Sequence, residues 1–416
     1  MKKALALFFA LALSTQAFAA KAPTHHSIRA ESMGNAHVAV VDDKEAIYFN
    51  YAGLSQINRL GNYEKRPEQG YYPRNYFDMR LNLGGAGPFE SYFATYQDAK
   101  DLQKLYNRVN QAAEETGLSQ TNLLLDTLAA HPELIHTLNS YDHKALSMKV
   151  KMDAELALHN LGGAIWVDGN VAPYIDAGLV LPYLTIDTFY VDAVMQGGIA
   201  YDFTNEFSFG IGIKGAKRQK VEMIVMDIAN YETINDTLQD RFEDAEKHIF
   251  DTKTISIGMD FGTLWQATRE VRLGLSLRDV YFKDLAGDKI TPNLTMGVNY
   301  SPRFFNVNTA YARKFNIACD YADAFDSDRN YKIMHHFNLG LEIEQVLLAW
   351  PGLNNQLRVL SGRLAAGFKG GYPTFGAGVE VLHVLTLEFA TWAEERGYYT
   401  GQDEERIYMG QISLGF

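Results

Sequence analysis

Residues 405–416 read E-R-I-Y-M-G-Q-I-S-L-G-F. Every second position back from the end gives Phe416, Leu414, Ile412, Gly410 and Tyr408, a mainly apolar and aromatic set. The positions between them are Gly415, Ser413, Gln411 and Met409, which are mostly small or polar. Side chains that alternate with a period of two lie on opposite faces of a β-strand. The segment therefore predicts an amphipathic strand that ends on an aromatic residue.

A final amphipathic strand ending in Phe is typical of the closing strand of a bacterial outer-membrane barrel. We therefore expect Phe416 to serve as the assembly signal that the barrel-insertion machinery reads. A soluble β-sandwich, which can also end on a strand, is the alternative interpretation of this segment.

The first residues predict export from the cytoplasm. Lys2 and Lys3 precede a short apolar core at 5–13, and Ala17-Phe18-Ala19 forms a small-x-small cleavage pattern. This arrangement is typical of a secretory signal peptide and is too short for a spanning helix. We expect residues 1–19 to be removed by cleavage after Ala19.

Composition restricts the kind of membrane protein that the rest of the chain can form. Beyond the signal, no apolar run approaches the roughly 18 residues of a spanning helix, so a membrane protein must be a barrel that pairs all its backbone groups. A mean hydropathy of −0.19 is compatible with a barrel, because half of each strand faces a polar lumen. The formal net charge of −12 argues against a nucleic-acid partner.

Alternation recurs along the chain, and its polar phase is often charged. Val150, Met152, Ala154, Leu156 and Leu158 interleave with Lys151, Asp153, Glu155 and Ala157. A barrel in lipid would direct the apolar phase outward, and a sandwich would direct it inward, so the pattern alone does not separate the two.

The spacing of the alternating segments predicts an all-β, 14-stranded antiparallel transmembrane barrel spanning 74–416 in the outer membrane of a Gram-negative bacterium. The expected strands are 74–84, 146–158, 161–171, 183–202, 206–217, 252–264, 270–281, 291–301, 304–315, 332–346, 357–369, 373–383, 385–394 and 404–416. Connections after even-numbered strands are mostly tight, apart from 347–356. Connections after odd-numbered strands are longer, as outer loops of barrels are.

Two of the long connections carry helical periodicity. Apolar residues at spacings of three and four predict helical inserts at 88–142 and 218–251. The first insert is rich in leucine, so it forms either a packed cap on the barrel mouth or a groove for a hydrophobic molecule. The candidate ligand-binding residues of the groove are Leu102, Leu105, Leu124 and Leu128.

Residues 20–73 precede the first expected strand and contain a distinctive pattern at 28–57. It is carried by Met33, Gly34, Ala36, Val38, Val40, Asp42, Asp43, Ala46, Asn50, Ala52, Gly53 and Leu54. The pattern resembles the N-terminal segment of the FadL-like outer-membrane barrels, with Tyr51 in place of the usual proline. The inserts are most similar to those of the TraF-like group within that superfamily.

The resemblance implies that 20–73 is a plug inside or under the barrel, with Met33, Gly34, Asp42, Asp43, Asn50 and Gly53 as its characteristic residues. Gly34 and Gly53 suit tight turns. Asp42 and Asp43 suit hydrogen bonds at a helix start or ion pairs with lumenal Arg272 or Arg278. These residues act either as scaffold or in ligand binding.

Motifs of catalysis and metal binding are missing from the sequence. There is no H-E-x-x-H, C-x-x-C, G-x-S-x-G or Walker loop. The adjacent pairs His25-His26 and His335-His336 would point to opposite faces of a strand and cannot chelate one metal. We therefore expect neither an enzyme nor a bound cofactor, and we expect no metal site; loose binding of calcium by the outer loops stays open.

Two functions remain open. The chain either passes small hydrophobic molecules across the outer membrane, or serves as a structural or assembly protein of a secretion or conjugation system with a closed lumen. Its expected partners are the lipid bilayer, the barrel-insertion machinery and, for the first function, a hydrophobic small molecule.

Overall fold

The fold was analysed in a computed structural model of the chain. The residues that it describes are 23–57, 76–86, 108, 111–112, 115–117, 123, 126, 130, 147–171, 173–176, 183–186, 189–221, 224–226, 255–281, 285, 290–302, 304–305, 313–325, 333–350, 357–395, 401 and 404–415.

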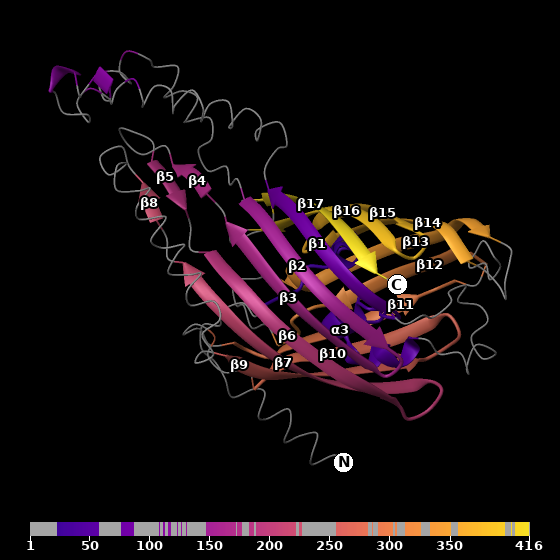
Figure 1. Cartoon of the computed structure of the whole chain (residues 1–416). Coiled ribbons are helices and arrows are strands. Elements are labelled where there is room, and N and C mark those ends of the chain that lie inside the picture. Colours follow the sequence, from indigo (N-terminus) through magenta and orange to yellow (C-terminus); the bar gives the residue numbers. More distant parts are fainter. Residues whose placement is uncertain are drawn as a thin grey trace.

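Fourteen strands close into one antiparallel barrel (Figure 1). In chain order they are β1 (Tyr76–Ala86), β2 (Ser147–Leu158), β3 (Leu161–Val171), β6 (Phe189–Asp202), β7 (Phe207–Val221), β9 (Ser256–Gln266), β10 (Val271–Val280), β11 (Asn293–Tyr300), β12 (Arg313–Tyr321), β13 (Phe337–Trp350), β14 (Leu357–Lys369), β15 (Tyr372–Val381), β16 (Leu385–Glu395) and β17 (Glu404–Gly415). Each strand pairs with its neighbour in the chain, and β1 pairs with β17 to close the sheet.

The orientation of the side chains decides between barrel and sandwich. Along β2, the apolar residues Met148 and Met152 are 61% and 59% exposed, whereas Lys151 and Asp153 are buried. The charged phase therefore faces the inside of the barrel and the apolar phase faces outward. This is the reverse of a soluble sandwich and is the arrangement that lipid requires.

The outer surface has further features of a membrane-facing wall. Exposed aromatic side chains gather near the short connections, including Tyr201, Phe203 and Trp265. Such belts form where a barrel crosses from hydrocarbon to headgroups. Among the described residues, no helix is both long enough and apolar enough to cross a membrane.

Most strand positions agree with the sequence-based expectation, but the strand expected at 304–315 agrees only in part: Phe304 and Phe305 lie in a turn, and 313–315 are strand. Strand β12 runs from Arg313 to Tyr321, and residues 306–312 lie outside the described part of the chain. Alternation continues on both sides of residue 313. β12 continues this alternation beyond residue 315, where the inward-facing Asp320 accepts hydrogen bonds from the amides of His37 and Val38.

The second insert also differs from the expectation. Strand β7 extends to Val221, and the short strand β8 (Ile224–Met226) follows it, so the first residues of 218–251 are extended and not helical. β8 joins β4 (Pro173–Asp176) and β5 (Tyr183–Ile186) in a three-stranded sheet beside the ends of β3 and β7 (Figure 1). In the first insert, the described residues Arg108, Gln111 and Leu123 are helical.

The connections largely follow the predicted parity. The ends of the barrel are named here by them: the short-turn end carries 159–160, 203–206 and 267–270, and the long-connection end carries 87–146 and 222–255. One two-residue turn, Gly370-Gly371, lies at the long-connection end and is an exception. Both glycines have positive φ, as so tight a turn requires.

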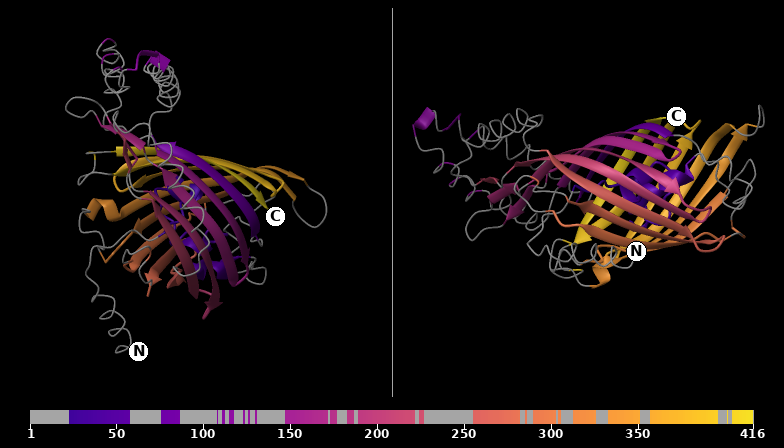
Figure 2. Two further views of the ribbon diagram at one scale, coloured as in Figure 1. Left: turned by 60° about the vertical axis from the view of Figure 1, so that its left-hand side comes forward. Right: turned by 90° about the horizontal axis from the view of Figure 1, so that it is seen from below.

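Residues 23–57, here called the N-terminal segment, lie inside the barrel (Figures 1 and 2). They form α2 (Ile28–Ser32), α3 (Ala46–Phe49) and the 3-10 helix η1 (Tyr51–Gln56). Nearly all of their side chains are buried, and the helices contact β3, β6, β7, β9 and β14–β17. The barrel interior is therefore a packed core that the N-terminal segment supplies.

The orientation of β2 predicts how a charge on its outer face will act. Met152→Arg, near the middle of β2, should lower the free energy of unfolding by about 2–4 kcal/mol, because the charge would enter hydrocarbon. Urea unfolding of the protein refolded into lipid vesicles measures this loss. Glu206→Arg in the exposed short turn is the control and should change stability little. Equal effects of the two substitutions would contradict the membrane-facing assignment.

Candidate functional site in the barrel lumen

The N-terminal segment crosses the lumen from one end of the barrel to the other. Near the long-connection end, Glu31 pairs with Lys369 at an N–O distance of 2.8 Å. Near the short-turn end, the Ser55 hydroxyl donates to Ser208 at 2.9 Å, and Nδ1 of His159 lies 2.8 Å from the Ile57 carbonyl oxygen. Any path along the lumen must pass this segment.

Buried ion pairs attach the middle of the segment to β12 and β13. Arg29 donates through Nε and Nη2 to both carboxylate oxygens of Glu342, at 2.6 and 2.7 Å, and through Nη1 to Asp43 at 2.5 Å. Asp42 pairs with Lys314. A bidentate guanidinium–carboxylate pair is strong and directional, so it holds α2 at a defined place against the wall.

A second set of ion pairs attaches the segment to β1 and β2. Arg80 pairs with Glu45 at 2.8 Å, with Asp153 at 2.9 Å and with Glu155. Lys44 lies 3.3 Å from Glu155. Here the segment supplies both an acid and a base, and the wall supplies the complementary charges.

Together these groups form the charge network, defined as Arg29, Asp42, Asp43, Lys44 and Glu45 of the segment with Asp78, Arg80, Asp153, Glu155, Lys314 and Glu342 of the wall. Removing one partner from such a buried pair leaves an uncompensated charge. The network therefore resists displacement of the segment from this side of the lumen.

Asp42 and Asp43 hold partners that differ in part from the prediction. Asp43 accepts a hydrogen bond from the Glu45 amide at 3.0 Å, at the start of α3, as a helix-start residue does. Asp42 pairs with Lys314, and the positive charge of the predicted Arg272 also acts on it. Burial alone would raise the pKa of Asp42, but Lys314 and Arg29 outweigh it and lower that pKa.

Two buried histidines of the segment stay neutral. His25 stacks on Tyr48 with ring centroids 3.4 Å apart, and its Nε2 lies 3.2 Å from Asp153. Burial, aided by Lys151, lowers the pKa of His25 to about 3, and burial with Arg29 lowers the pKa of His37 to about 4. The adjacent His26 faces Glu31 instead, at 2.8 Å.

The described residues contain no group of three His, Cys, Asp or Glu placed to hold a metal ion.

Asp320 on β12 binds the backbone of the segment. Its fully buried carboxylate accepts from the amides of His37 and Val38 at 2.7 and 2.9 Å. Successive amides that converge on one oxygen form an anion-binding turn. This contact anchors the chain between α2 and α3 to the wall.

Glycines line the wall wherever the backbone of the segment approaches it. They are Gly162 on β3, Gly198 on β6, Gly210 and Gly212 on β7, Gly262 on β9, Gly274 on β10, Gly297 on β11, Gly340 on β13, Gly367 on β14 and Gly376 on β15, and we call this set the glycine ring. A Cβ added at any of them would collide with the segment or with atoms that contact it. The wall therefore needs glycine at these positions for close approach and not for turns.

The segment residues singled out in the sequence have identifiable roles in this contact. Gly34 has φ +63° and lies against the carbonyls of Leu339 and Phe368, so it needs both the left-handed conformation and a missing side chain. Gly53 faces Val41 and Ala46, where close approach is its only requirement.

The carbonyl of buried Met33 faces Gly340. The side-chain Nδ2 of Asn50 donates at 3.0 Å to the carbonyls of Val38 and Thr263.

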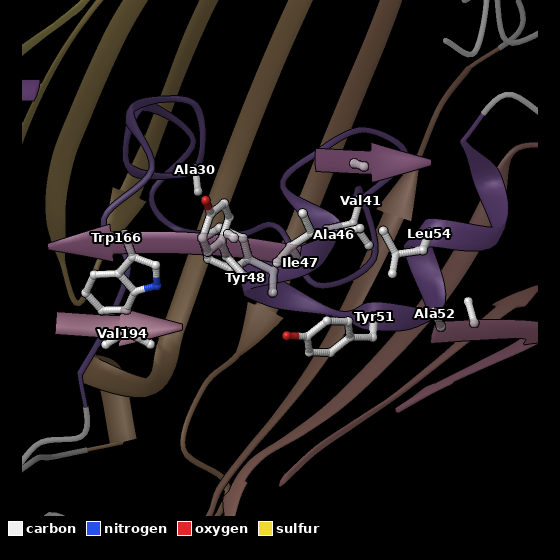
Figure 3. Packing of buried hydrophobic residues seen from close by; sticks show 14 of the residues in the cluster. Ala30, Val41, Ala46, Ile47, Tyr48, Tyr51, Ala52, Leu54, Trp166 and Val194 are labelled. Carbon is white, nitrogen blue, oxygen red and sulfur yellow. The ribbon is translucent and has the colours of Figure 1, made fainter. Parts of the chain in front are cut away.

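The other side of the segment packs against an apolar wall. Ile47, Tyr48, Tyr51, Ala52 and Leu54 of the segment join Ala164 and Trp166 of β3, Val194 of β6, Ala216 of β7 and Leu264 of β9 in one buried cluster (Figure 3). We call this contact the apolar flank. The charge network thus marks a charged side of the lumen, at β1–β2 and β12–β13. The apolar flank lies at β3–β9, where the wall also carries the buried ion pairs Arg218–Asp192 and Lys214–Asp260.

The remaining candidate residues lie outside the described part of the chain. These are Leu102, Leu105, Leu124 and Leu128 of the predicted groove and Phe416, the predicted assembly signal. The sequence analysis missed Arg29, Glu45, Arg80, Asp153, Glu155 and Glu342, which carry the charge network. Their signal was present, because each wall member occupies the charged phase of an alternating strand, but the sequence pattern does not say which inward charge meets which residue of the segment.

A closed sheet with an apolar exterior, a charged interior and a chain segment through its lumen is a transmembrane β-barrel of the bacterial outer-membrane class. Neither a protein-family model nor a curated protein sequence matches this chain.

Similar barrels exist among solved structures. The toluene transporter TbuX of Ralstonia pickettii is 10% identical with a TM-score of 0.44, over 94% of this chain and 97% of that one. The toluene transporter TodX of Pseudomonas putida is 9% identical with a TM-score of 0.44, over 96% and 99%. The monoaromatic hydrocarbon channel CymD is 9% identical with a TM-score of 0.41, over 93% and 96%.

The charge network predicts strong coupling between Arg29 and Glu342. Arg29→Met and Glu342→Gln should each destabilise the protein by about 3–5 kcal/mol, because each leaves a buried charge without its partner. The double variant should lose at least about 1 kcal/mol less than the sum, as contacting residues do. Urea unfolding in lipid vesicles gives the three values. Arg406→Gln, which breaks the partly exposed pair with Glu404, is the control and should cost about 0–1 kcal/mol. Additive losses for the buried pair would refute the coupling.

The glycine ring predicts that a side chain at Gly367 blocks docking of the segment. Gly367→Val should abolish the compact, heat-modifiable band on gels, because its Cβ would meet the backbone of Met33 and Gly34. Gly163→Val is the matched control, since a Cβ there makes only ordinary contacts, with Gln196 and Gly197. Normal folding of Gly367→Val would show that the segment is not seated as described.

Proposed function

We propose that this protein passes small hydrophobic molecules across the outer membrane, and that the N-terminal segment is a plug that the solute must pass. The observation that carries the proposal is the apolar flank, a buried apolar contact between the segment and the wall that lies apart from the charge network. A uniformly charged interior would offer an apolar solute no favourable surface.

The free-energy cost of separating the plug from the barrel wall differs between the two sides of the plug. On the charged side, parting Arg29 from Glu342 or Arg80 from Glu45 would cost about 3–5 kcal/mol for each pair. On the apolar flank, a hydrophobic solute can replace the plug as the covering surface of Trp166 and Val194, at about 25 cal/mol for each Å² kept from water. Opening along the apolar flank is therefore the less costly route, and it selects apolar solutes.

The first insert supplies a further element of the proposal. Its leucine-rich stripes at 102–138 hold more apolar side chains than a solvated loop tolerates. We place a capture groove there, with Leu102, Leu105, Leu124 and Leu128 as its lining. The resemblance of residues 28–57 to the FadL-like segment, which implies a plugged barrel, supports the same function.

The charge network itself favours the second candidate. A lumen held shut by buried ion pairs suits a structural or assembly protein of a secretion or conjugation system, of the TraF-like kind, whose partners bind the long connections. In that case the apolar flank is packing alone, and no solute crosses.

Uptake of a hydrophobic fluorescent probe separates the two functions. Cells that carry the wild-type protein should accumulate N-phenyl-1-naphthylamine several-fold faster than cells without it. Leu105→Asp and Leu124→Asp should each reduce this gain, because a charge in the groove opposes burial of the probe. Asp126→Asn, at an exposed helical position of the same insert, is the control and should leave uptake unchanged.

Assembly must be verified in every strain from the heat-modifiable band of the barrel. If cells without the protein take up the probe as fast as the wild type, the channel function is wrong and the closed-lumen function becomes the better account. If both leucine variants retain full uptake, the capture groove is wrong, although passage along the apolar flank remains.

A further inference from the structure

Tyr51 lies flat against the wall of the barrel at the edge of the apolar flank. It is the first residue of η1 and is 2% exposed. Figure 3 shows its hydroxyl directed away from Ala52 and Leu54 of the same short helix. The residue is also the position at which the segment departs from the pattern of residues 28–57, where proline is usual.

Three members of the glycine ring form a notch for this ring. A Cβ at Gly198 would meet Cδ1 and Cε1 of Tyr51, and one at Gly212 would meet Cδ2, Cε2 and Cζ. A Cβ at Gly210 would meet the Tyr51 backbone and its Cβ. Backbone of β6 and β7 thus borders both edges and the base of the aromatic ring. The notch has the dimensions of one six-membered ring because it already holds one.

The notch lies close to a charged group of the wall. Lys214, the next inward-facing residue after Gly212, pairs with Asp279 and lies 3.7 Å from Asp260. The two carboxylates are near enough to act on the Tyr51 hydroxyl: burial first, and then Asp260 and Asp279, hold the pKa of Tyr51 well above its ordinary value. The neutral hydroxyl is therefore a hydrogen-bond donor near two acceptors.

The Tyr51 hydroxyl makes no hydrogen bond within the described part of the chain. Its position is set by the backbone of η1, which Asn50 caps through a bond from the Ala52 amide at 3.1 Å. A tethered phenol therefore fits the notch in shape but leaves its polar end unsatisfied. A free phenol carries no such restraint and can shift until its hydroxyl donates to a carboxylate.

We propose that the notch of Gly198, Gly210 and Gly212 is a binding site for a monocyclic phenol, and that Tyr51 occupies it as an internal ligand while the plug is closed. This inference rests on the proposed function, for which it names the solute class. A phenol that enters the notch displaces Tyr51, and with it the start of η1, from the apolar flank. The solute thereby opens the side of the plug along which it passes.

The test measures binding of 4-methylphenol, the side chain of tyrosine as a free molecule, to the purified mature protein in detergent. Tyr51→Ala empties the notch. 4-Methylphenol should raise its thermal midpoint and bind it at least tenfold more tightly than toluene, which has the same shape without the hydroxyl. Leu54→Ala is the matched control, a truncation of a buried residue in the same short helix, and should show no preference for the phenol.

Two further variants test the polar end and the internal ligand. Asp279→Asn in the Tyr51→Ala background should reduce the preference for 4-methylphenol over toluene. Tyr51→Phe keeps the ring in the notch and should bind 4-methylphenol more weakly than Tyr51→Ala does. If Tyr51→Ala does not refold alone, its refolding yield with added 4-methylphenol, compared with toluene, gives the same answer.

Equal stabilisation of Tyr51→Ala and Leu54→Ala by 4-methylphenol, or equal binding of toluene and the phenol by Tyr51→Ala, would overturn the phenol site. A Tyr51→Ala chain that folds with neither compound would do so as well. These outcomes are independent of the proposed function, which fails only when wild-type cells take up hydrophobic probe no faster than cells without the protein.

Discussion

Buried charge is the constraint on which the rest of this structure depends. The inward phase of the strands places Arg80, Asp153, Glu155, Lys314 and Glu342 in a lumen where each is at most 5% exposed. Charges so far from bulk water require partners of opposite sign at close range. The N-terminal segment supplies several of these partners. Several buried charges of the wall, and the charges of the segment that pair with them, would therefore lack ion-pair partners if the two were separated.

The same dependence explains the glycine ring. Ion pairs and amide–carboxylate bonds act over about 3 Å, so the backbone of the segment must touch the backbone of the wall. Glycine on nine strands allows that contact on most sides of the lumen. Where the wall carries bulkier residues, as at Trp166 and Val194, apolar side chains of the segment pack against them. The apolar flank follows from this pattern of small and large inward residues.

Much of the barrel follows from period-two alternation, because a strand in lipid must separate its two faces. The run Val271, Leu273, Leu275 and Leu277 is β10 as predicted. The end of β12 did not follow: alternation predicted a strand that stops at residue 315, whereas β12 continues to Tyr321 and places Asp320 against the N-terminal segment.

The contacts of a site residue were predictable only where they involve residues close to it in the sequence. The role of Asp43 at the start of α3 depends on neighbours in sequence and was anticipated. The partner of Asp42 was not, because Lys314 is 272 residues away and any inward-facing base satisfies the sequence pattern equally. The glycines were visible in the polar phase of the strands, but their purpose depends on a segment that approaches them only in three dimensions.

The N-terminal segment lies in the lumen, and the proposed function requires an apolar route past it in place of a water-filled one. The most direct measurement is the ion conductance of the wild-type mature protein inserted in a planar lipid bilayer. The account predicts that insertion, verified by recovery of the folded protein from the bilayer, produces no stable ohmic current. A steady current through single wild-type barrels would show an open aqueous lumen and would contradict the claim.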